Sequence, residues 1–172
     1  MKRVLLTGGL GYIGSHTAVV LAEADFDVVL YDNLSNSKSS VLIRLESITG
    51  VRFPLVEGDV RDTKLLAETL RAYHIDAVFH FAGLKAVGES VESPLEYHDN
   101  NMVGTLSLAR AMQSVGVYTL VFSSSATVYG DPQYLPIDEE HATSATNPYG
   151  RTKLHIEEML ADLSKSDPKW RI

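Results

Sequence analysis

The sequence predicts a doubly wound α/β fold, in which helices cover both faces of a parallel sheet. Short apolar runs alternate with longer amphipathic runs along the chain, which is the order of strands joined by helical crossovers. Most of the short runs lack polar/apolar alternation, as strands buried on both faces do. A glycine-rich stretch after the first run supports the same fold, because such turns join a strand to a helix at a ligand site.

Five strands and five helices are expected. The strands are expected at residues 3–7, 27–31, 52–56, 77–81 and 119–123, each short and rich in β-forming residues. The helices are expected near residues 12–24, 38–48, 62–73, 94–115 and 148–166. The last helix carries an apolar stripe at i, i+3, i+4 and i+7, made by Ile156, Met159, Leu160 and Leu163. The 94–115 helix is apolar on more than one side, which fits either burial within the monomer or a partner surface.

Composition excludes several classes of function. The 172 residues make one domain or a large part of one, with 45% apolar and 22% charged residues. A net charge of −7 without a basic run argues against nucleic-acid binding. There is no cysteine, and the six histidines lack ligand spacing, so no metal site is expected. No apolar run reaches the ~20 residues that span a membrane, and no signal peptide precedes the first strand, so we expect a cytoplasmic protein.

The first strand leads into the sequence T-G-G-L-G-Y-I-G at residues 7–14, in the strand–turn–helix context of a Rossmann-type dinucleotide site. Gly8 allows the tight turn, Gly11 lets the backbone approach a pyrophosphate, and Gly14 permits close helix–strand packing. The N-terminus of the first helix then faces the phosphates. The alternative is that the glycines serve only a tight turn.

The next three strands end in residues that fit the same cofactor. Asp32 lies where a carboxylate accepts hydrogen bonds from an adenine ribose and repels a 2′-phosphate, which favours NAD over NADP; a turn or helix cap is the alternative. Asp59 either contacts adenine or caps the 62–73 helix. The small residues Ala82 and Gly83 let a dinucleotide lie across the sheet edge, and we interpret His80 as a packed strand residue.

Candidate catalytic residues follow the fifth strand. Hydroxyls at the carboxyl end of a strand, here at residues 123–125, face the ligand crevice and can relay a proton, unless they only satisfy backbone groups. Tyr149 and Lys153 are four apart and so share a helix face. A lysine cation at roughly 6 Å, with an effective dielectric of about 20, stabilises a phenolate by ~2.8 kcal/mol. In this context the pair predicts a tyrosine base, although an isolated pair would be read as an exposed helical pair.

Three segments carry a resemblance to a known family. The glycine motif, the serine cluster and the Tyr-x-x-x-Lys pair resemble the extended short-chain dehydrogenase/reductase superfamily. More narrowly, the segments 80–90, 97–105 and 123–130 are similar to the N-terminal half of the UDP-glucose (UDP-galactose) 4-epimerase family. This resemblance covers the whole chain.

The resemblance implies a role for each matching residue. Ser125 is the catalytic hydroxyl, Tyr149 is the base, and Lys153 binds the nicotinamide ribose and favours the phenolate. The implied NAD contacts are Gly8, Gly11, Tyr12, Ile13, Gly14, Asp32, Asn33, Asn36, Ser37, Asp59, Val60, Phe81, Ala82, Gly83, Lys85, Asn100, Ser123, Tyr149 and Lys153.

The resemblance also implies a reaction and a setting. Tyr149 takes the proton of the sugar 4-hydroxyl while hydride passes to NAD, the 4-keto sugar turns over, and hydride returns to its other face. UDP-glucose and UDP-galactose are thereby interconverted, as in galactose metabolism. In the family the nucleotide-sugar pocket lies largely in a C-terminal domain. We therefore expect residues 1–172 to be a truncated NAD-binding domain with little activity alone. The 169–172 segment looks like the opening of another strand. A homodimer through the 94–115 and 148–166 helices is implied for the full-length protein.

Three other readings stay open. A nucleotide-sugar 4,6-dehydratase shares the fold and the Tyr/Lys pair, but in that family an Asp-Glu pair stands where this chain has Ala126 and Thr127. A simple dehydrogenase, which releases its cofactor, is opposed only by the resemblance over residues 81–90. A non-catalytic dinucleotide-binding domain needs the glycine loop but not the catalytic residues.

Overall fold

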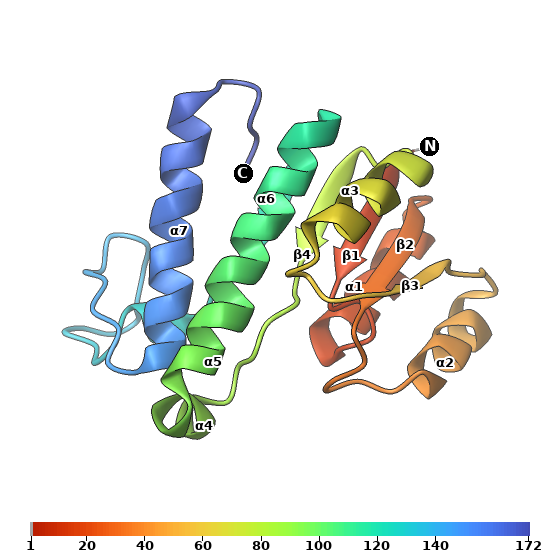
Figure 1. Ribbon diagram of the computed structural model, residues 1–172. Helices are drawn as coiled ribbons and strands as arrows, with labels where there is room; N and C mark the ends of the chain where they lie inside the picture. Colours follow the sequence, from red (N-terminus) through yellow and green to blue (C-terminus); the bar gives the residue numbers. More distant parts are fainter. Residues whose placement is uncertain (1) are drawn as a thin grey trace.

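The computed structural model describes residues 2–172 and contains the predicted parallel sheet (Figure 1). Its strands are β1 (Arg3–Thr7), β2 (Asp27–Asp32), β3 (Leu55–Glu57), β4 (Ala77–His80) and β5 (Leu120–Phe122). They pair in the order β3-β2-β1-β4-β5, and every pair is parallel. The strand order reverses between β1 and β4. In a doubly wound sheet such a switch point opens a ligand crevice at the carboxyl ends of the strands.

Helices cover both faces of this sheet, so the doubly wound fold is confirmed. The longer helices are α1 (Tyr12–Glu23), α2 (Ser40–Thr49), α3 (Thr63–Ala72), α6 (Gly104–Val115) and α7 (Pro148–Ser166). Successive strand residues point to opposite faces. On one face they pack with α1 and α2, through Val4, Leu6, Val28, Leu30, Ala18 and Leu45. On the other they pack with α3, α6 and α7, through Leu5, Val29, Val78, Leu66, Leu108 and Ile156.

The region after β4 differs from the sequence prediction. The expected 94–115 helix is three consecutive pieces: α5 (Pro94–His98), a π-helical turn η1 (Asp99–Val103) and α6. A further short helix, α4 (Val87–Glu92), precedes them and was not predicted. The third strand begins at Leu55 rather than at residue 52, because Pro54 has no backbone N–H to donate to a sheet. The other boundaries agree with the prediction to within two residues, and those of β1 and α7 match it.

The C-terminal segment lies against the free edge of β5. Arg171 forms a parallel bridge with Thr119, and its N–H donates to the Tyr118 carbonyl at 2.9 Å. The buried Trp170 ring packs edge-on against Tyr118, with the ring centroids 5.2 Å apart. The expected further strand is therefore present as a single bridge. Within residues 2–172, no helix combines the length and apolar character needed to cross a bilayer.

Candidate functional site

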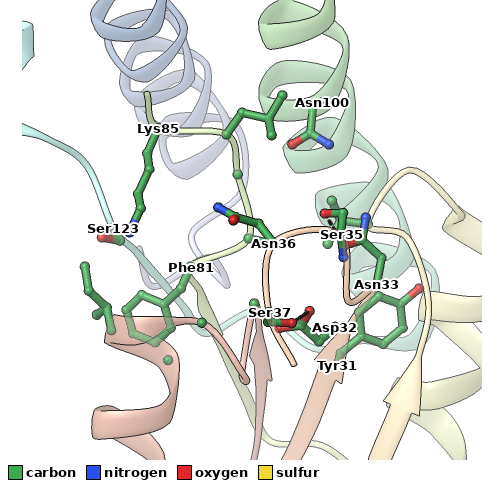
Figure 2. Close-up of a pocket in the computed structure, with 18 of the residues that line it drawn as sticks. Tyr31, Asp32, Asn33, Ser35, Asn36, Ser37, Phe81, Lys85, Asn100 and Ser123 are labelled. Carbon is green, nitrogen blue, oxygen red and sulfur yellow. Dashed lines mark hydrogen bonds between the residues drawn. The ribbon is translucent and has the colours of Figure 1, made fainter. Parts of the chain in front are cut away.

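A pocket of about 330 Å³ opens at the carboxyl ends of the strands (Figure 2). Asp32 and Ser37 lie at its sheet side, and Lys85 and Asn100 lie across from them. Most of the predicted cofactor residues line it: Gly8, Gly11, Tyr12, Ile13, Gly14, Asp32, Asn33, Asn36, Ser37, Val60, Phe81, Ala82, Gly83, Lys85, Asn100 and Ser123. Tyr31, Ser35, Gly58 and Leu84 also line it and were not predicted.

The glycine turn forms one end of this pocket and fits an anionic group. Gly8 adopts φ +67°, and a Cβ there would lie 2.7 Å from the Ala82 nitrogen. A Cβ on Gly14 would overlap the Gly8 carbonyl oxygen, so both positions require glycine. Gly11 precedes α1 and supplies no side-chain cap, and the first turn carries no acidic residue. The N–H groups at the start of α1 therefore remain available to a phosphate.

The Asp32 carboxylate is buried at the pocket wall and braces the neighbouring loop. Its Oδ2 accepts from the Leu10 N–H at 2.9 Å, and its Oδ1 accepts from the Leu34 N–H at 2.9 Å and the Ser37 hydroxyl at 2.8 Å. Asp32 therefore does cap the turn that follows β2, as the alternative interpretation predicted. Because the residue also lines the pocket, it can accept a ribose hydroxyl as well.

Asp59 does not line the pocket, although its neighbours Gly58 and Val60 do. Its carboxylate accepts from Arg61 Nε at 2.9 Å and Nη2 at 2.7 Å. This hydrogen bonding holds the pKa of Asp59 down at about 2. The interpretation of Asp59 as a helix cap is wrong, because Asp62 accepts from the Leu65 N–H and caps α3 instead.

Arg61 links two walls of the pocket. Besides Asp59, its guanidinium binds the Asp99 carboxylate, with Nη1 to Oδ2 at 2.6 Å. Asp99 begins the π-helical turn η1, which carries Asn100 into the pocket. One side chain thus joins the loop after β3 to the turn that precedes α6.

The two adjacent asparagines of η1 serve different surroundings. Asn100 lines the pocket. Asn101 is buried and clamps the loop after β4, since its Oδ1 accepts from the Leu84 N–H at 2.8 Å and its Nδ2 donates to the Leu84 carbonyl at 3.0 Å. The same Nδ2 donates to Thr152 Oγ1 at 3.1 Å, on α7. Sequence reasoning missed Asn101 and Thr152, since neither belongs to a motif that predicts such contacts.

Lys153 is a buried cation at the end of β5. Its Nζ donates to the Ser123 carbonyl at 2.8 Å and lies 4.6 Å from the centre of the Phe122 ring. Burial lowers its pKa to about 8, and the nearby Glu157 carboxylate acts in the opposite direction. The side chain is only 5% exposed. Its charge is therefore held at the sheet edge that forms the pocket.

Tyr149 lies in the first turn of α7, one helical turn before Lys153. Asn147 caps this helix by accepting from the Gly150 N–H, and Pro148 occupies a first-turn position. The buried Tyr149 ring meets the edge of the Tyr97 ring at 80°, with the centroids 6.5 Å apart. Its backbone N–H donates to the Ser90 hydroxyl at 3.2 Å.

Tyr97 is anchored in turn by Glu89 and Ala86. Its hydroxyl donates to a Glu89 carboxylate oxygen at 2.7 Å and accepts from the Ala86 N–H at 3.0 Å. Burial and this carboxylate raise the pKa of Tyr97 to about 12. α4, which was not predicted, and α5 therefore form the wall that holds the Tyr149 ring.

Ser125 begins a short 3-10 turn, η2 (Ala126–Val128), which packs on the start of α7. Its Oγ accepts from the Thr127 N–H at 3.2 Å and from the Thr127 hydroxyl at 2.9 Å. The approach of α7 is close enough that a Cβ on Gly150 would lie 2.8 Å from the Thr127 carbonyl oxygen. Ser125, Tyr149 and Lys153 do not line the pocket themselves, although the last two are predicted NAD contacts, but the fold packs η2 and the start of α7 against each other beside it.

Comparisons with known proteins give a family and a set of relatives. The family model described as GDP-mannose 4,6 dehydratase matches residues 5–171. A UDP-glucose 4-epimerase of Yersinia pestis is 55% identical over 170 residues, covering 98% of this chain and 50% of the relative. One of Dictyostelium discoideum is 54% identical over 168 residues, covering 98% and 49%. The chain spans about half the length of the curated relatives it matches.

Solved structures give the same result. A UDP-glucose 4-epimerase from Bifidobacterium longum, in complex with NAD+ and UDP, superposes with a TM-score of 0.97 at 49% identity, covering 99% of this chain and 51% of the other. One from Stenotrophomonas maltophila, with bound NAD and formylated UDP-arabinopyranose, gives 0.95 at 49% identity, covering 96% and 49%. The predicted resemblance to UDP-glucose 4-epimerases is therefore confirmed.

Proposed function

The chain belongs to the GDP-mannose 4,6 dehydratase family, and we propose that it is the NAD-binding part of a UDP-glucose 4-epimerase. The observation that carries this proposal is the buried Tyr149–Lys153 turn, packed beside a pocket that a glycine turn and Asp32 line. Curated relatives at 50–55% identity support it, because those relatives are UDP-glucose 4-epimerases.

On this proposal, different pocket residues bind different parts of the cofactor. The N–H groups of Tyr12 and Ile13 bind the pyrophosphate, and Asp32 accepts the adenine ribose hydroxyls, together with Asn33, Asn36 and Ser37. Val60 and the backbone at Asp59 lie beside the adenine, and Lys85 and Asn100 lie along the other wall. The Asp32 carboxylate disfavours a 2′-phosphate, so the cofactor is NAD rather than NADP.

The chemistry of the chain is proton transfer and charge stabilisation. Tyr149, as phenolate, takes the proton of a sugar 4-hydroxyl, and the Lys153 ammonium stabilises that phenolate. Ser125 hydrogen-bonds the same hydroxyl and relays its proton. Bound NAD would supply the hydride acceptor and donor at the sugar carbon. The sugar leaves with that centre inverted if the hydride is restored to its opposite face while Tyr149 gives the proton back, and there is then no net redox change.

The family model is named for a dehydratase, which makes elimination the second candidate function. Elimination of water needs an additional acid and base beside the Tyr/Lys pair. Ala126 and Thr127 stand where the dehydratases carry an Asp-Glu pair, and neither side chain titrates near neutral pH. Epimerisation is therefore favoured over dehydration.

The substrate and assembly belong to the same proposal. UDP-glucose and UDP-galactose are the proposed substrates, since solved relatives are described with UDP or UDP-glucose. We place the nucleotide-sugar half of the site in the part of the relatives that this chain does not match. A homodimer through the 94–115 and 148–166 regions, a cytoplasmic location and a role in galactose metabolism stay predictions.

Two measurements test the function. The 172-residue chain should bind NAD in a calorimetric titration but should turn over UDP-galactose poorly by itself. In a full-length protein that contains this sequence, Tyr149→Phe should abolish turnover and leave NAD bound, and Tyr118→Phe, remote from the pocket, should leave both intact. Loss of NAD binding in Tyr149→Phe would mean that the base is misassigned. If the full-length protein made a 4-keto-6-deoxy sugar from UDP- or dTDP-glucose, its activity would be that of a dehydratase and not that of an epimerase.

A further inference from the structure

A chain of buried polar side chains runs from the central strands to α7. Its members are Thr7 on β1, His80 on β4, Thr105 on α6, Asn101 in η1 and Thr152 on α7, and all are at most 2% exposed. Polar groups taken out of water destabilise a core unless each finds a hydrogen-bond partner. The contacts between these five residues therefore constrain how the strands, η1 and α7 sit together.

The hydrogen bonds of this network have a fixed direction. The Thr105 hydroxyl donates its one proton to the Asn101 carbonyl at 2.7 Å, so at its 3.0 Å contact with His80 Nε2 it accepts. Nε2 must then carry the proton, and Nδ1 accepts from the Thr7 hydroxyl at 2.6 Å. Full burial and the nearby Lys153 cation lower the pKa of His80 to about 3, which keeps the ring neutral.

The Thr105 bond supports the π-helical turn. A π turn interrupts the regular i→i−4 hydrogen bonds of a helix, and the Thr105 hydroxyl bonds the Asn101 carbonyl inside that turn. Asn100, within this turn, lines the pocket, and the adjacent Asn101 binds the Leu84 backbone. A change at Thr105 should therefore reach the pocket wall.

The network continues from Asn101 to the catalytic turn. Asn101 Nδ2 donates to the Thr152 hydroxyl, and that hydroxyl donates to the Tyr149 carbonyl at 2.7 Å. Thr152 also precedes Lys153 directly in the sequence. An unbroken path of hydrogen bonds thus joins the sheet to the backbone that presents Tyr149 and Lys153.

We propose that His80 is a positioning residue which, as a neutral Nε2–H donor, holds Thr105, the π-helical turn and Asn101 so that the Tyr149–Lys153 turn stays in register with the pocket. His80 touches neither cofactor nor substrate on this proposal and acts through Thr105. The inference rests on the proposed function only for the identity of the cofactor, because the network is defined by the chain alone.

Matched threonine variants separate positioning from ordinary stability. Thr105→Val removes the hydroxyl at nearly constant volume, and Thr105→Ser restores it. Thr69→Val on α3 is the control, because Thr69 is also buried and also donates its hydroxyl to the carbonyl four residues earlier, Leu65, at 2.8 Å. Among the described residues, Thr69 forms no side-chain hydrogen bond with the network and does not line the pocket.

Three measurements on the 172-residue chain follow. They are the urea unfolding midpoint, the NAD dissociation constant, and the pH titration of the Lys153 ε-methylene group by NMR. Both Thr105→Val and Thr69→Val should lower the urea midpoint, and Thr105→Val by more, because it also leaves the buried His80 Nε2–H without an acceptor. Thr105→Val alone should weaken NAD binding about tenfold and raise the titration midpoint of Lys153, because a loosened α7 turn exposes its ammonium to water. Thr105→Ser should stay within about twofold of the parent in NAD affinity.

Specific results would overturn the proposal. One is a Thr105→Val variant that matches Thr69→Val in both NAD affinity and Lys153 titration. Another is an imidazole ¹⁵N spectrum that places the His80 proton on Nδ1. If the parent chain binds no NAD, the cofactor assignment fails, but the Lys153 titration still decides whether the network positions the turn.

Discussion

The burial of the Lys153 cation predicts a contribution to the free energy of unfolding that increases as pH rises through the alkaline range. Burial lowers its pKa from 10.5 to about 8, and one pKa unit corresponds to about 1.4 kcal/mol. The charge therefore destabilises the folded state at pH 7 by at most roughly 3 kcal/mol. The Ser123 carbonyl and the Phe122 ring both favour the charged form. We accordingly expect a net penalty of about 1–3 kcal/mol.

The sign of the pH dependence follows from the lowered pKa of Lys153. Below pH 8 the lysine is protonated in both states, and the penalty is fully present. Between pH 8 and 10.5 the folded state loses its proton first, so the free energy of unfolding rises with pH. Above 10.5 no further gain is expected from this group.

Urea unfolding of the parent and of Lys153→Met at pH 7 and pH 10 isolates this effect, because other groups titrate equally in both proteins. The Met variant should be the more stable at pH 7, and its advantage should shrink at pH 10. Lys64→Met is the control, since the Lys64 side chain is 86% exposed and should give no pH-dependent difference. A Lys153→Met difference that is constant with pH, or a less stable variant at pH 7, would refute the reasoning. A less stable Met variant would mean that the hydrogen bond to Ser123 stabilises the folded state by more than the burial of the charge destabilises it.

Three further substitutions test the pocket. Gly14→Ala should abolish NAD binding and lower the free energy of unfolding by about 3 kcal/mol, because the added Cβ overlaps the Gly8 carbonyl. Calorimetry measures the binding and urea unfolding measures the stability. Gly88→Ala is the control, because a Cβ at Gly88 has no atom within 4 Å. Asp32→Asn should narrow the preference for NAD over NADP by at least about tenfold in competitive binding, since the charge that repels a 2′-phosphate is lost; an unchanged ratio would remove Asp32 from that role. Arg61→Ala should change stability by less than about 1 kcal/mol, because its side chain is 41% exposed, yet should release NAD faster in stopped-flow displacement as its bridge to Asp99 is lost. An unchanged release rate would show that the bridge does not close the pocket.

The sheet and one side of the pocket could be predicted from sequence because local chemistry determines them. Continuous apolar strands indicate a parallel sheet whatever lies far along the chain. The T-G-G-L-G-Y-I-G turn can be recognised because its backbone requires glycine. Asp32 can be recognised because its role depends on its own charge. The caps were harder, because Asp59 and Asp62 stand three residues apart and either could precede α3. Asp62 caps the helix, since Arg61 holds the Asp59 carboxylate.

The other side of the pocket could not be predicted, because its shape depends on a change of helical register. Apolar residues recur through 94–115 much as they would in a regular helix, so periodicity gives no sign of a π turn at Asp99–Val103. Both Asn100 and Asn101 lie in that turn, and of the two Asn100 lines the pocket. The hydroxyl of Thr105 supports this turn. That hydroxyl accepts a hydrogen bond from His80, which lies on a strand 25 residues earlier in the sequence. Single-sequence patterns do not encode a contact of that kind.

The same contacts show why the Tyr149–Lys153 pair needs more than its own spacing to stay at the sheet edge. The spacing of a Tyr-x-x-x-Lys turn does not by itself keep the turn at the sheet edge, because the desolvation of the Lys153 ammonium opposes burial of the lysine. Two groups of contacts oppose its release: the Ser123 carbonyl and Phe122 ring hold the ammonium, and the Asn101–Thr152 bond holds the backbone. Relieving the charge by Lys153→Met should therefore leave the turn in place, whereas breaking the network at Thr105 should move it while the charge remains. This division of roles requires that Lys153→Met raise the free energy of unfolding at pH 7 and that Thr105→Val lower it. It also requires NAD binding to be weakened about tenfold in Thr105→Val.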